Sequence, residues 1–284
     1  MEFCNIHHIK ALLGRHGFHF SKGLGQNFLC EQSVPEDIAA GAGITPETCV
    51  LEVGPGIGAL TNQLCRRAKH VTAVELDKRL PAVLAETMAE FDNFDLVEGD
   101  ILQVDLPAIC KEHFGDSPAV ACANLPYYIT TPAITALMES GCFSAITVMV
   151  QKEVAHRICA KPGTADYGAF TVYINYHAKA SIILDVPRDC FIPAPNVDSA
   201  VVRLDVLDKP PVEGEEKQIF RVVKAAFAQR RKTLVNGLFA AYGDKWSKQE
   251  LSDLLVSLGF SASVRGEALS LEDFARLSVE LHKK

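Results

Sequence analysis

The segment Glu-Val-Gly-Pro-Gly-Ile-Gly, residues 52–58, is a glycine loop between a strand-like and a helix-like segment. It follows a short apolar run, Cys49–Val53, and opens a helical pattern, Gly58–Ala68. Glycines between a strand and a helix permit a tight turn and a close approach of the backbone to a ligand. The G-x-G-x-G pattern lacks the final spacing of the dinucleotide fingerprint and the Lys-Ser/Thr pair of a P-loop. Such glycines also serve turns without a ligand, so the loop alone identifies none.

Strand-length apolar runs alternate with helical patterns around this loop. The expected strands are Cys49–Val53, Val71–Glu75, Phe94–Glu98, Ala119–Asn124 and Ile146–Gln151, and the expected helices are Pro35–Gly41, Gly58–Ala68, Leu80–Phe91 and Pro132–Met138. Strands spaced by helices indicate an α/β fold with a parallel sheet covered on both faces. Two later β-like runs, Phe170–Tyr176 and Ala200–Leu207, predict an antiparallel addition at one sheet edge.

A polar segment with two prolines and a glycine, Asp208–Glu216, predicts a linker. Every pattern after it is helical, with N-terminal capping signals at Ser247 and Ser270. The expected organisation is therefore one α/β domain, residues 1–208, followed by a small all-helical domain, residues 209–284.

The composition is that of a globular protein, with 284 residues, 48% of them hydrophobic and 22% charged. The longest apolar runs have strand length, so we expect no membrane span, and the N-terminus has no apolar core typical of a secretory signal. None of the nine cysteines forms a C-x-x-C pair, and several lie in apolar runs. We interpret them as buried residues of a cytoplasmic protein, and we expect neither disulfides nor a metal site.

The net charge of −7 argues against a nucleic-acid partner, but its distribution does not. Residues 209–284 contain 13 Lys and Arg against 10 Asp and Glu, a balance of +3, so residues 1–208 hold a balance of −10. Local positive surfaces can bind nucleic acid in a chain with an acidic total. A solvated surface with chance clustering is the equally weighted alternative.

Two acidic residues stand at or after the ends of the next two predicted strands. Glu75 ends Val71–Glu75, where its carboxylate can accept both hydroxyls of a ribose. Asp100 follows Phe94–Glu98, where it can accept a hydrogen bond from an adenine amino group. Each acid alone is explained as an exposed turn residue. With the glycine loop, they favour an adenosine held across the strand ends, which fits a nicotinamide enzyme as well as other adenosine-using enzymes.

The tetrapeptide Asn-Leu-Pro-Tyr, residues 124–127, ends a predicted strand and separates these alternatives. An adenine amino nitrogen is a poor nucleophile because its lone pair is delocalised into the ring. If the Asn124 side-chain oxygen and a backbone carbonyl, for which we choose Leu125, accept its N–H bonds, the nitrogen can pyramidalise as it attacks. Tyr127 or Tyr128 can stack on the base. The pattern predicts methyl transfer to a nucleobase, against the alternative of a Pro-containing turn with a buried Tyr.

A second rigid loop, Phe191–Ser199, is held by two prolines. Phe191 is either a stacking face for an extruded base or a core anchor for the loop, and the residues leave both possibilities open.

Together, these motifs resemble the family of small-subunit ribosomal RNA adenine dimethyltransferases. The matching segments, in the family's order, are Gln26–Leu29, Glu52–Gly58, Asn124–Thr130, Pro162–Gly168, Phe191–Ser199, Arg230–Leu234 and Leu269–Phe274. The segment Pro162–Gly168 points to this branch over the antibiotic-resistance methylases of large-subunit RNA. The first ~20 residues extend beyond the family's usual start, so Cys4 and His7 inherit no role.

The resemblance implies a Rossmann-like methyltransferase core and S-adenosylmethionine as the methyl donor, with no metal. It implies as acceptors two adjacent adenines near the 3′ end of 16S rRNA, each dimethylated at N6, in the 30S subunit or its precursor. We expect the chain to act as a monomer. Matching the family's donor contacts by motif, with Gly56 added from the loop, gives Asn27, Leu29, Gly54, Gly56, Glu75, Asp100 and Asn124. The expected catalytic residues are Asn124, Leu125, Tyr127 and Phe191.

Basic residues near one C-terminal helix are the candidates for RNA contact: Arg221, Lys224, Arg230, Arg231 and Lys232. Contacts of these cations with phosphates predict an affinity that falls steeply with salt. Looped or single-stranded RNA is the expected target, since a duplex hides the reacting adenine edge. A solvated helix face is the alternative for these residues. For the whole chain, the non-enzyme alternative is an RNA-binding assembly factor of the small subunit in which catalysis is secondary.

Overall fold

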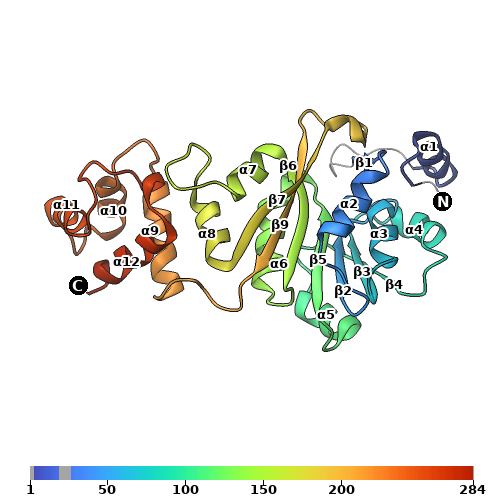
Figure 1. Cartoon of the computed structure of the whole chain (residues 1–284), viewed down its shortest axis with the longest axis horizontal. Coiled ribbons are helices and arrows are strands. Elements are labelled where there is room, and N and C mark those ends of the chain that lie inside the picture. Colours follow the sequence, from blue (N-terminus) through green and yellow to red (C-terminus); the bar gives the residue numbers. More distant parts are fainter. Residues whose placement is uncertain (1–2, 19–26, 284) are drawn as a thin grey trace. The chain divides into compact units, whose positions relative to one another are not determined.

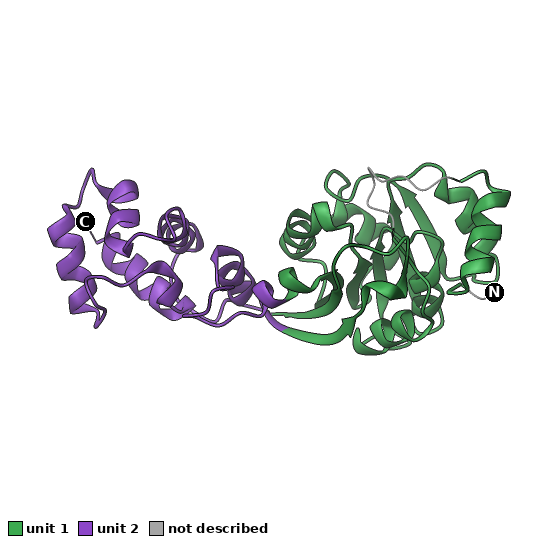
Figure 2. Cartoon of the chain, turned by 90° about the horizontal axis from the view of Figure 1, so that it is seen from above, with its two compact units in different colours: residues 1–155, 181–206 green, residues 156–180, 207–284 purple. Residues whose placement is uncertain are grey.

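The computed structural model describes residues 3–18 and 27–283, so Gln26 of the first matching segment lies outside the described residues (Figure 1). The chain forms two compact units (Figure 2), residues 1–155 with 181–206 and residues 156–180 with 207–284. We call them unit 1 and unit 2. No helix in the described part of the chain has the length and apolar character needed to cross a membrane.

Unit 1 is built on a seven-stranded sheet with the order β4-β3-β2-β5-β6-β9-β7. The strands are β2 (Cys49–Val53), β3 (His70–Glu75), β4 (Phe94–Glu98), β5 (Ala119–Asn124), β6 (Ala145–Gln151), β7 (Ala178–Val186) and β9 (Ser199–Val206). The first five in spatial order are parallel, and β9 runs antiparallel to β6. The five predicted parallel strands and the antiparallel addition at residues 200–207 are therefore confirmed.

Helices that lie wholly or partly in unit 1 surround these strands in the sequence, and α7 continues past Ala155 into unit 2. They are α1 (Ile6–Arg15), α2 (Ser33–Gly41), α3 (Ala59–Cys65), α4 (Leu80–Thr87), α5 (Leu106–Phe114), α6 (Thr130–Glu139) and α7 (Lys152–Ile158). The crossovers from β2 to β3 and β4 step one way across the sheet, and the crossover from β5 to β6 steps the other way. Because such crossovers are right-handed, α3 and α4 cover one face and α6 the other (Figure 1). The order reverses between β2 and β5, and ligands bind at the carboxyl ends of strands at such a point.

Residues 170–176 form a helix, so the strand predicted there is wrong. The helix is α8 (Ala169–His177), and the Thr171 side chain accepts the N–H of its N-terminal capping residue. Val172 and Tyr176 lie one turn apart and pack into the core of unit 2. β-branched and aromatic residues favour strands intrinsically, but burial of one helical face overrides that preference. The strand that pairs with β9 on the side away from β6 is β7, which follows α8.

Unit 2 is helical. Besides α8, it contains α9 (Glu216–Phe227), α10 (Leu234–Tyr242), α11 (Lys248–Ser257) and α12 (Leu271–Leu281). The Oγ atoms of Ser247 and Ser270 each accept a backbone N–H at 3.2 Å, which confirms both capping signals. Residues 207–215 form neither helix nor strand, as expected for the linker.

The boundary between the units differs from the expected division at residue 208. Residues 156–180, which were assigned to the first domain, belong to unit 2. The reason is hydrophobic packing, since Tyr167 and Val172 are fully buried in the cluster of apolar side chains that forms the unit 2 core.

Candidate active site

A cavity of ≈ 310 Å³ lies in unit 1, at the carboxyl ends of β2, β3 and β5. All seven residues expected to hold the donor line it: Asn27, Leu29, Gly54, Gly56, Glu75, Asp100 and Asn124. Leu125 and Tyr127 of the expected catalytic set line it as well. The volume is within the range of ligand pockets. Residues that are far apart in the sequence therefore meet where the strand order reverses.

The glycine loop owes its course to backbone conformations that only glycine adopts without strain. Gly54 has φ +66° and its N–H donates to the Val74 oxygen at 2.9 Å, which ties the end of β2 to β3. At Gly58, φ is +92°, and an added Cβ would come within 2.6 Å of the Met88 Cε. A Cβ at Gly54 would meet nothing within 4 Å. Gly58 therefore serves the packing against α4, whereas Gly54 serves the turn beside the cavity.

Glu75 ends β3 as a buried carboxylate, 7% exposed. Its Oε1 accepts the Asp77 N–H at 2.7 Å. Burial raises the pKa of Glu75, and backbone N–H donors from Asp77 and Gly56 oppose that shift. The side chain is thus held rigidly at the strand end, where its carboxylate can accept hydroxyl donors.

Asp100 follows β4 and is fixed by its own turn. Its Oδ1 accepts the Leu102 N–H at 3.0 Å, and its Oδ2 accepts from the Gln103 Nε2 at 3.1 Å. Asp100 is therefore a turn residue, as one of the two explanations from the sequence expected. It does not compete with ligand binding, because a carboxylate has lone pairs beyond these two bonds.

Glu52 lines the same cavity, although the sequence analysis gave it no role of its own. It is 1% exposed, and its Oε2 has no hydrogen-bond partner among the residues that the structure describes. Burial raises the pKa of Glu52 to about 8, and the nearby Thr61 hydroxyl opposes this shift. The available signal was a carboxylate inside an otherwise apolar strand, Cys49–Val53. A buried carboxyl with an unsatisfied oxygen at a cavity suits a cationic ligand.

Asn124 is the last residue of β5, and its side chain is oriented by the segment opposite. Its Nδ2 donates to the Asn27 oxygen in a long contact of 3.4 Å. The amide oxygen therefore points away from Asn27. The following residue, Leu125, is 1% exposed, and its N–H donates to the Met149 oxygen at 3.2 Å. This bond extends the pairing of β5 with β6 by one residue and fixes the backbone where the tetrapeptide begins.

The two tyrosines after Pro126 have different environments. The Tyr127 hydroxyl lies 2.8 Å from the Ser199 Oγ, and partial burial raises the pKa of Tyr127. Tyr128 is 57% exposed and also lines the cavity. The Tyr127 ring is thus held through its hydroxyl, whereas the Tyr128 ring presents an open aromatic face.

Phe191 does not line the cavity. It lies in β8 (Phe191–Ile192), which pairs with β1 (Phe28–Leu29), and it is 4% exposed within the unit 1 core. Pairing with Leu29 puts these two side chains on the same face, within the unit 1 core. Of the two possibilities left open by the sequence, this arrangement supports the core anchor, and the stacking role stays a prediction.

The five basic candidates for RNA contact lie on α9 and in the turn that follows it. Arg221 donates to the Ala241 oxygen at 2.8 Å, with its guanidinium 4.4 Å from the Tyr242 ring centre. Arg230 donates to the Ala165 and Tyr167 oxygens at 2.8 and 2.9 Å. These two side chains therefore stabilise unit 2 itself. Lys224, Arg231 and Lys232 are exposed.

Residues 17–275 match the model of a family described as ribosomal RNA adenine dimethylase. The chain belongs to the ribosomal RNA adenine dimethylase family. It is 47% identical over 273 residues to ribosomal RNA small subunit methyltransferase A of Geobacillus thermodenitrificans, with 95% of this chain and 93% of the relative covered. The protein of the same name from Lactococcus lactis is 47% identical over 277 residues, with 96% and 94% covered. Membership excludes the nicotinamide oxidoreductase alternative.

Solved structures agree with the fold. The crystal structure of the 23S rRNA methyltransferase ErmE matches with a TM-score of 0.70 at 28% identity, over 90% of this chain and 99% of the other. A dimethyladenosine transferase from Plasmodium falciparum matches with a TM-score of 0.73 at 25% identity, over 90% and 97%. The predicted Rossmann-like methyltransferase core with a helical C-terminal region is confirmed. Enzymes of this fold modify RNA of the large or of the small ribosomal subunit, so the fold alone does not identify the substrate.

Proposed function

We propose that this chain transfers methyl groups from S-adenosylmethionine to N6 of two adjacent adenines near the 3′ end of 16S rRNA. The substrate is this RNA within the 30S subunit or its precursor, and the enzyme works as a cytoplasmic monomer without a metal in the reaction. The names of the curated relatives support the small subunit as the target. The observation that supports the chemistry is that Asn124 shares one cavity with Glu75 and Asp100.

In this proposal, the donor lies across the carboxyl ends of the strands. The Glu75 carboxylate accepts the ribose hydroxyls, and Asp100 accepts from the adenine amino group of the donor. The left-handed turn at Gly54 lets the backbone pass close to the methionine portion. Glu52, buried with an unsatisfied oxygen, balances the positive charge of the donor.

The acceptor adenine is held by oxygens at the end of β5. The Asn124 Oδ1 and the Leu125 carbonyl accept the two N–H bonds of the amino group, which supports a pyramidal nitrogen in the transition state. Tyr128 supplies the open aromatic face on which the base stacks, with Tyr127 fixed beside it. Most of the rate enhancement comes from placing the nitrogen in line with the methyl carbon.

The transfer needs no strong base. The lone pair of the amino nitrogen attacks the methyl carbon while the carbon–sulfur bond breaks, and its electron pair goes to sulfur. The donor leaves as the neutral thioether S-adenosylhomocysteine, and the nitrogen becomes cationic. It then releases its proton to water. A second donor molecule repeats the step on the monomethylated nitrogen.

In this proposal, RNA is bound by exposed cationic side chains of unit 2 other than the two arginines that hydrogen-bond within it. Lys224, Arg231 and Lys232 are proposed to meet phosphates, whereas Arg221 and Arg230 contribute mainly by holding α9 and α10 in place. Phosphate contacts fix position and carry no sequence information, so the choice of adenine rests with the cavity.

The test is incubation of the protein with labelled donor and undermethylated small subunits, followed by mapping of the modified bases. The expected result is dimethylation of two adjacent adenines near the 3′ end of 16S rRNA. Asn124→Ala is expected to abolish most methylation while subunit binding persists. Asn175→Ala, on α8 of unit 2, is the matched control and is expected to retain activity.

Two results would contradict the proposal. Near-wild-type turnover by Asn124→Ala would remove the amino-gripping role. Subunit binding by the wild type with no methyl transfer would instead favour the assembly-factor alternative.

A further inference from the structure

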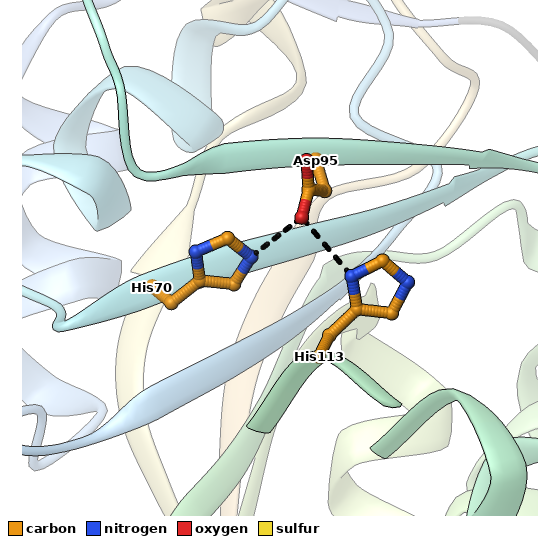
Figure 3. A group of neighbouring side chains, drawn as sticks. All are labelled: His70, Asp95 and His113. Carbon is orange, nitrogen blue, oxygen red and sulfur yellow. Dashed lines mark hydrogen bonds and ion pairs between the residues drawn. The ribbon is translucent and has the colours of Figure 1, made fainter. Parts of the chain in front are cut away.

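Three potential metal ligands converge at the amino ends of β3 and β4 (Figure 3). His70 is the first residue of β3, Asp95 is the second residue of β4, and His113 lies in the last turn of α5. The Asp95 Oδ2 is 3.1 Å from the His70 Nε2 and 3.0 Å from the His113 Nδ1. All three atoms lie within 4.8 Å of one another.

The two imidazoles are held in place by packing. Their side chains are 22% and 19% exposed for His70 and His113, whereas Asp95 is 52% exposed. The rings lie nearly parallel, with centres 6.2 Å apart and 15° between their planes, and Phe114 packs edge-on against His70. The cluster is therefore rigid on its inner side and open to solvent at the carboxylate, as a metal site with a water ligand requires.

Hydrogen bonding accounts for only one of the two close contacts. The His113 Nδ1 and the Asp95 Oδ2 have hydrogen-bond geometry at 3.0 Å. The His70 Nε2 is at a similar distance, but it is a buried atom without a suitably directed hydrogen bond to any residue that the structure describes. Leaving a buried polar atom unsatisfied is costly, and coordination to a cation would satisfy this nitrogen.

We propose that His70, Asp95 and His113 bind one Zn²⁺ ion. Two neutral imidazoles and one carboxylate give a single negative charge and the nitrogen-rich ligand set that zinc prefers over Mg²⁺ or Ca²⁺. Bonds of ~2.0–2.1 Å in a tetrahedron place ligand atoms about 3.3 Å apart. The two pairs at 3.0 and 3.1 Å need only a small opening to reach that spacing. Water takes the fourth position.

This site would take no part in methyl transfer, because it lies at the opposite end of the strands from the methyl-transfer cavity. Glu75 at the other end of β3 lines that cavity, and His70 does not. The ion would join α5 to β3 and β4, the last of which is an edge strand of the sheet. The three ligands are spread over residues 70–113, so no short sequence motif marks them.

The test is titration of the metal-stripped full-length protein with Zn²⁺ by calorimetry, repeated with Co²⁺ as a spectroscopic probe. One saturable site is expected, with Co²⁺ bands free of thiolate charge transfer. His70→Gln, Asp95→Asn and His113→Gln are each expected to weaken binding about a hundredfold. At a hundredfold excess of Zn²⁺ over its Kd, the melting temperature should rise by about 5 °C. Exposed His156→Gln is the matched control and should behave as the wild type.

Retention of wild-type affinity by the three variants would overturn the proposal, because the ion would then sit elsewhere, at the N-terminal histidines or the cysteines. A thiolate band with Co²⁺ would identify the cysteines directly. Absence of saturable binding would show that the cluster is only a hydrogen-bonded group. Unchanged donor binding by each variant would establish that a loss of zinc affinity is not a loss of folding.

Discussion

Donor binding should release a proton, and Glu52 should be its source. The carboxyl is 1% exposed, and burial raises its pKa to about 8 in the free protein. At pH 7, most of these carboxyls therefore carry a proton. A cationic donor in the adjoining cavity favours the ionised form.

The size of the effect follows from Coulomb's law. A unit positive charge about 4 Å from the carboxylate, at an effective dielectric constant of about 20, contributes roughly 4 kcal/mol. That energy corresponds to a fall of about 3 in the pKa, because one pKa unit is ~1.4 kcal/mol. The pKa of Glu52 would then lie well below 7, and donor binding at pH 7 would release most of one proton.

The assay is calorimetric titration of the protein with the donor at pH 7 in buffers with different ionisation enthalpies. The apparent binding enthalpy should vary linearly with the ionisation enthalpy, with a slope that gives the number of protons released. Glu52→Gln is isosteric and cannot ionise, so its slope should be near zero. A wild-type slope near zero, or an equal slope in Glu52→Gln, would refute the assignment.

Four further outcomes are expected. Burial raises the pKa of Glu52 above its ordinary value of 4.5, so the folded state binds this proton more tightly than the unfolded chain does. The free energy of unfolding should therefore fall as the pH rises from 4.5 to about 8. Denaturant titrations over this range should show a shallower pH dependence for Glu52→Gln. Phe191→Ala should lower the free energy of unfolding by ~3–5 kcal/mol, and wild-type stability with lost methylation would instead support stacking. Gly58→Ala should destabilise by more than ~1 kcal/mol in thermal unfolding, since it meets both a positive φ and Met88, and an unchanged melting temperature would contradict this. The double variant Arg231→Glu and Lys232→Glu should weaken RNA binding and reduce the slope of log affinity against log salt by about 1–2, and an unchanged slope would remove these phosphate contacts.

The five parallel strands were predictable because each is a short run rich in apolar residues, and four of the five end in a polar residue. The run Ala119–Asn124 shows why, since its five buried residues are followed by a half-buried amide at the cavity. Local pattern and tertiary burial agree there. At Ala169–His177 they disagree, and an element rich in β-branched and aromatic residues folds as a helix because one of its faces is needed in the unit 2 core.

The positions of candidate site residues were predictable where those residues stand at the ends of predicted strands. Glu75 and Asn124 could be placed because parallel strands bring their carboxyl ends to one edge of the sheet. The burial of Glu52 and the inward position of Phe191 depend on packing from other elements, so the sequence could not fix either role. The same holds for His70, whose partners come from β4 and α5.

The most direct test is a crystal structure of the protein with bound S-adenosylhomocysteine. We predict that the ribose hydroxyls lie within hydrogen-bonding distance of the Glu75 carboxylate, with the sulfur directed toward the Asn124 side-chain oxygen. A ligand bound outside this cavity would contradict the account. So would an Asn124 amide oxygen facing away from the bound sulfur.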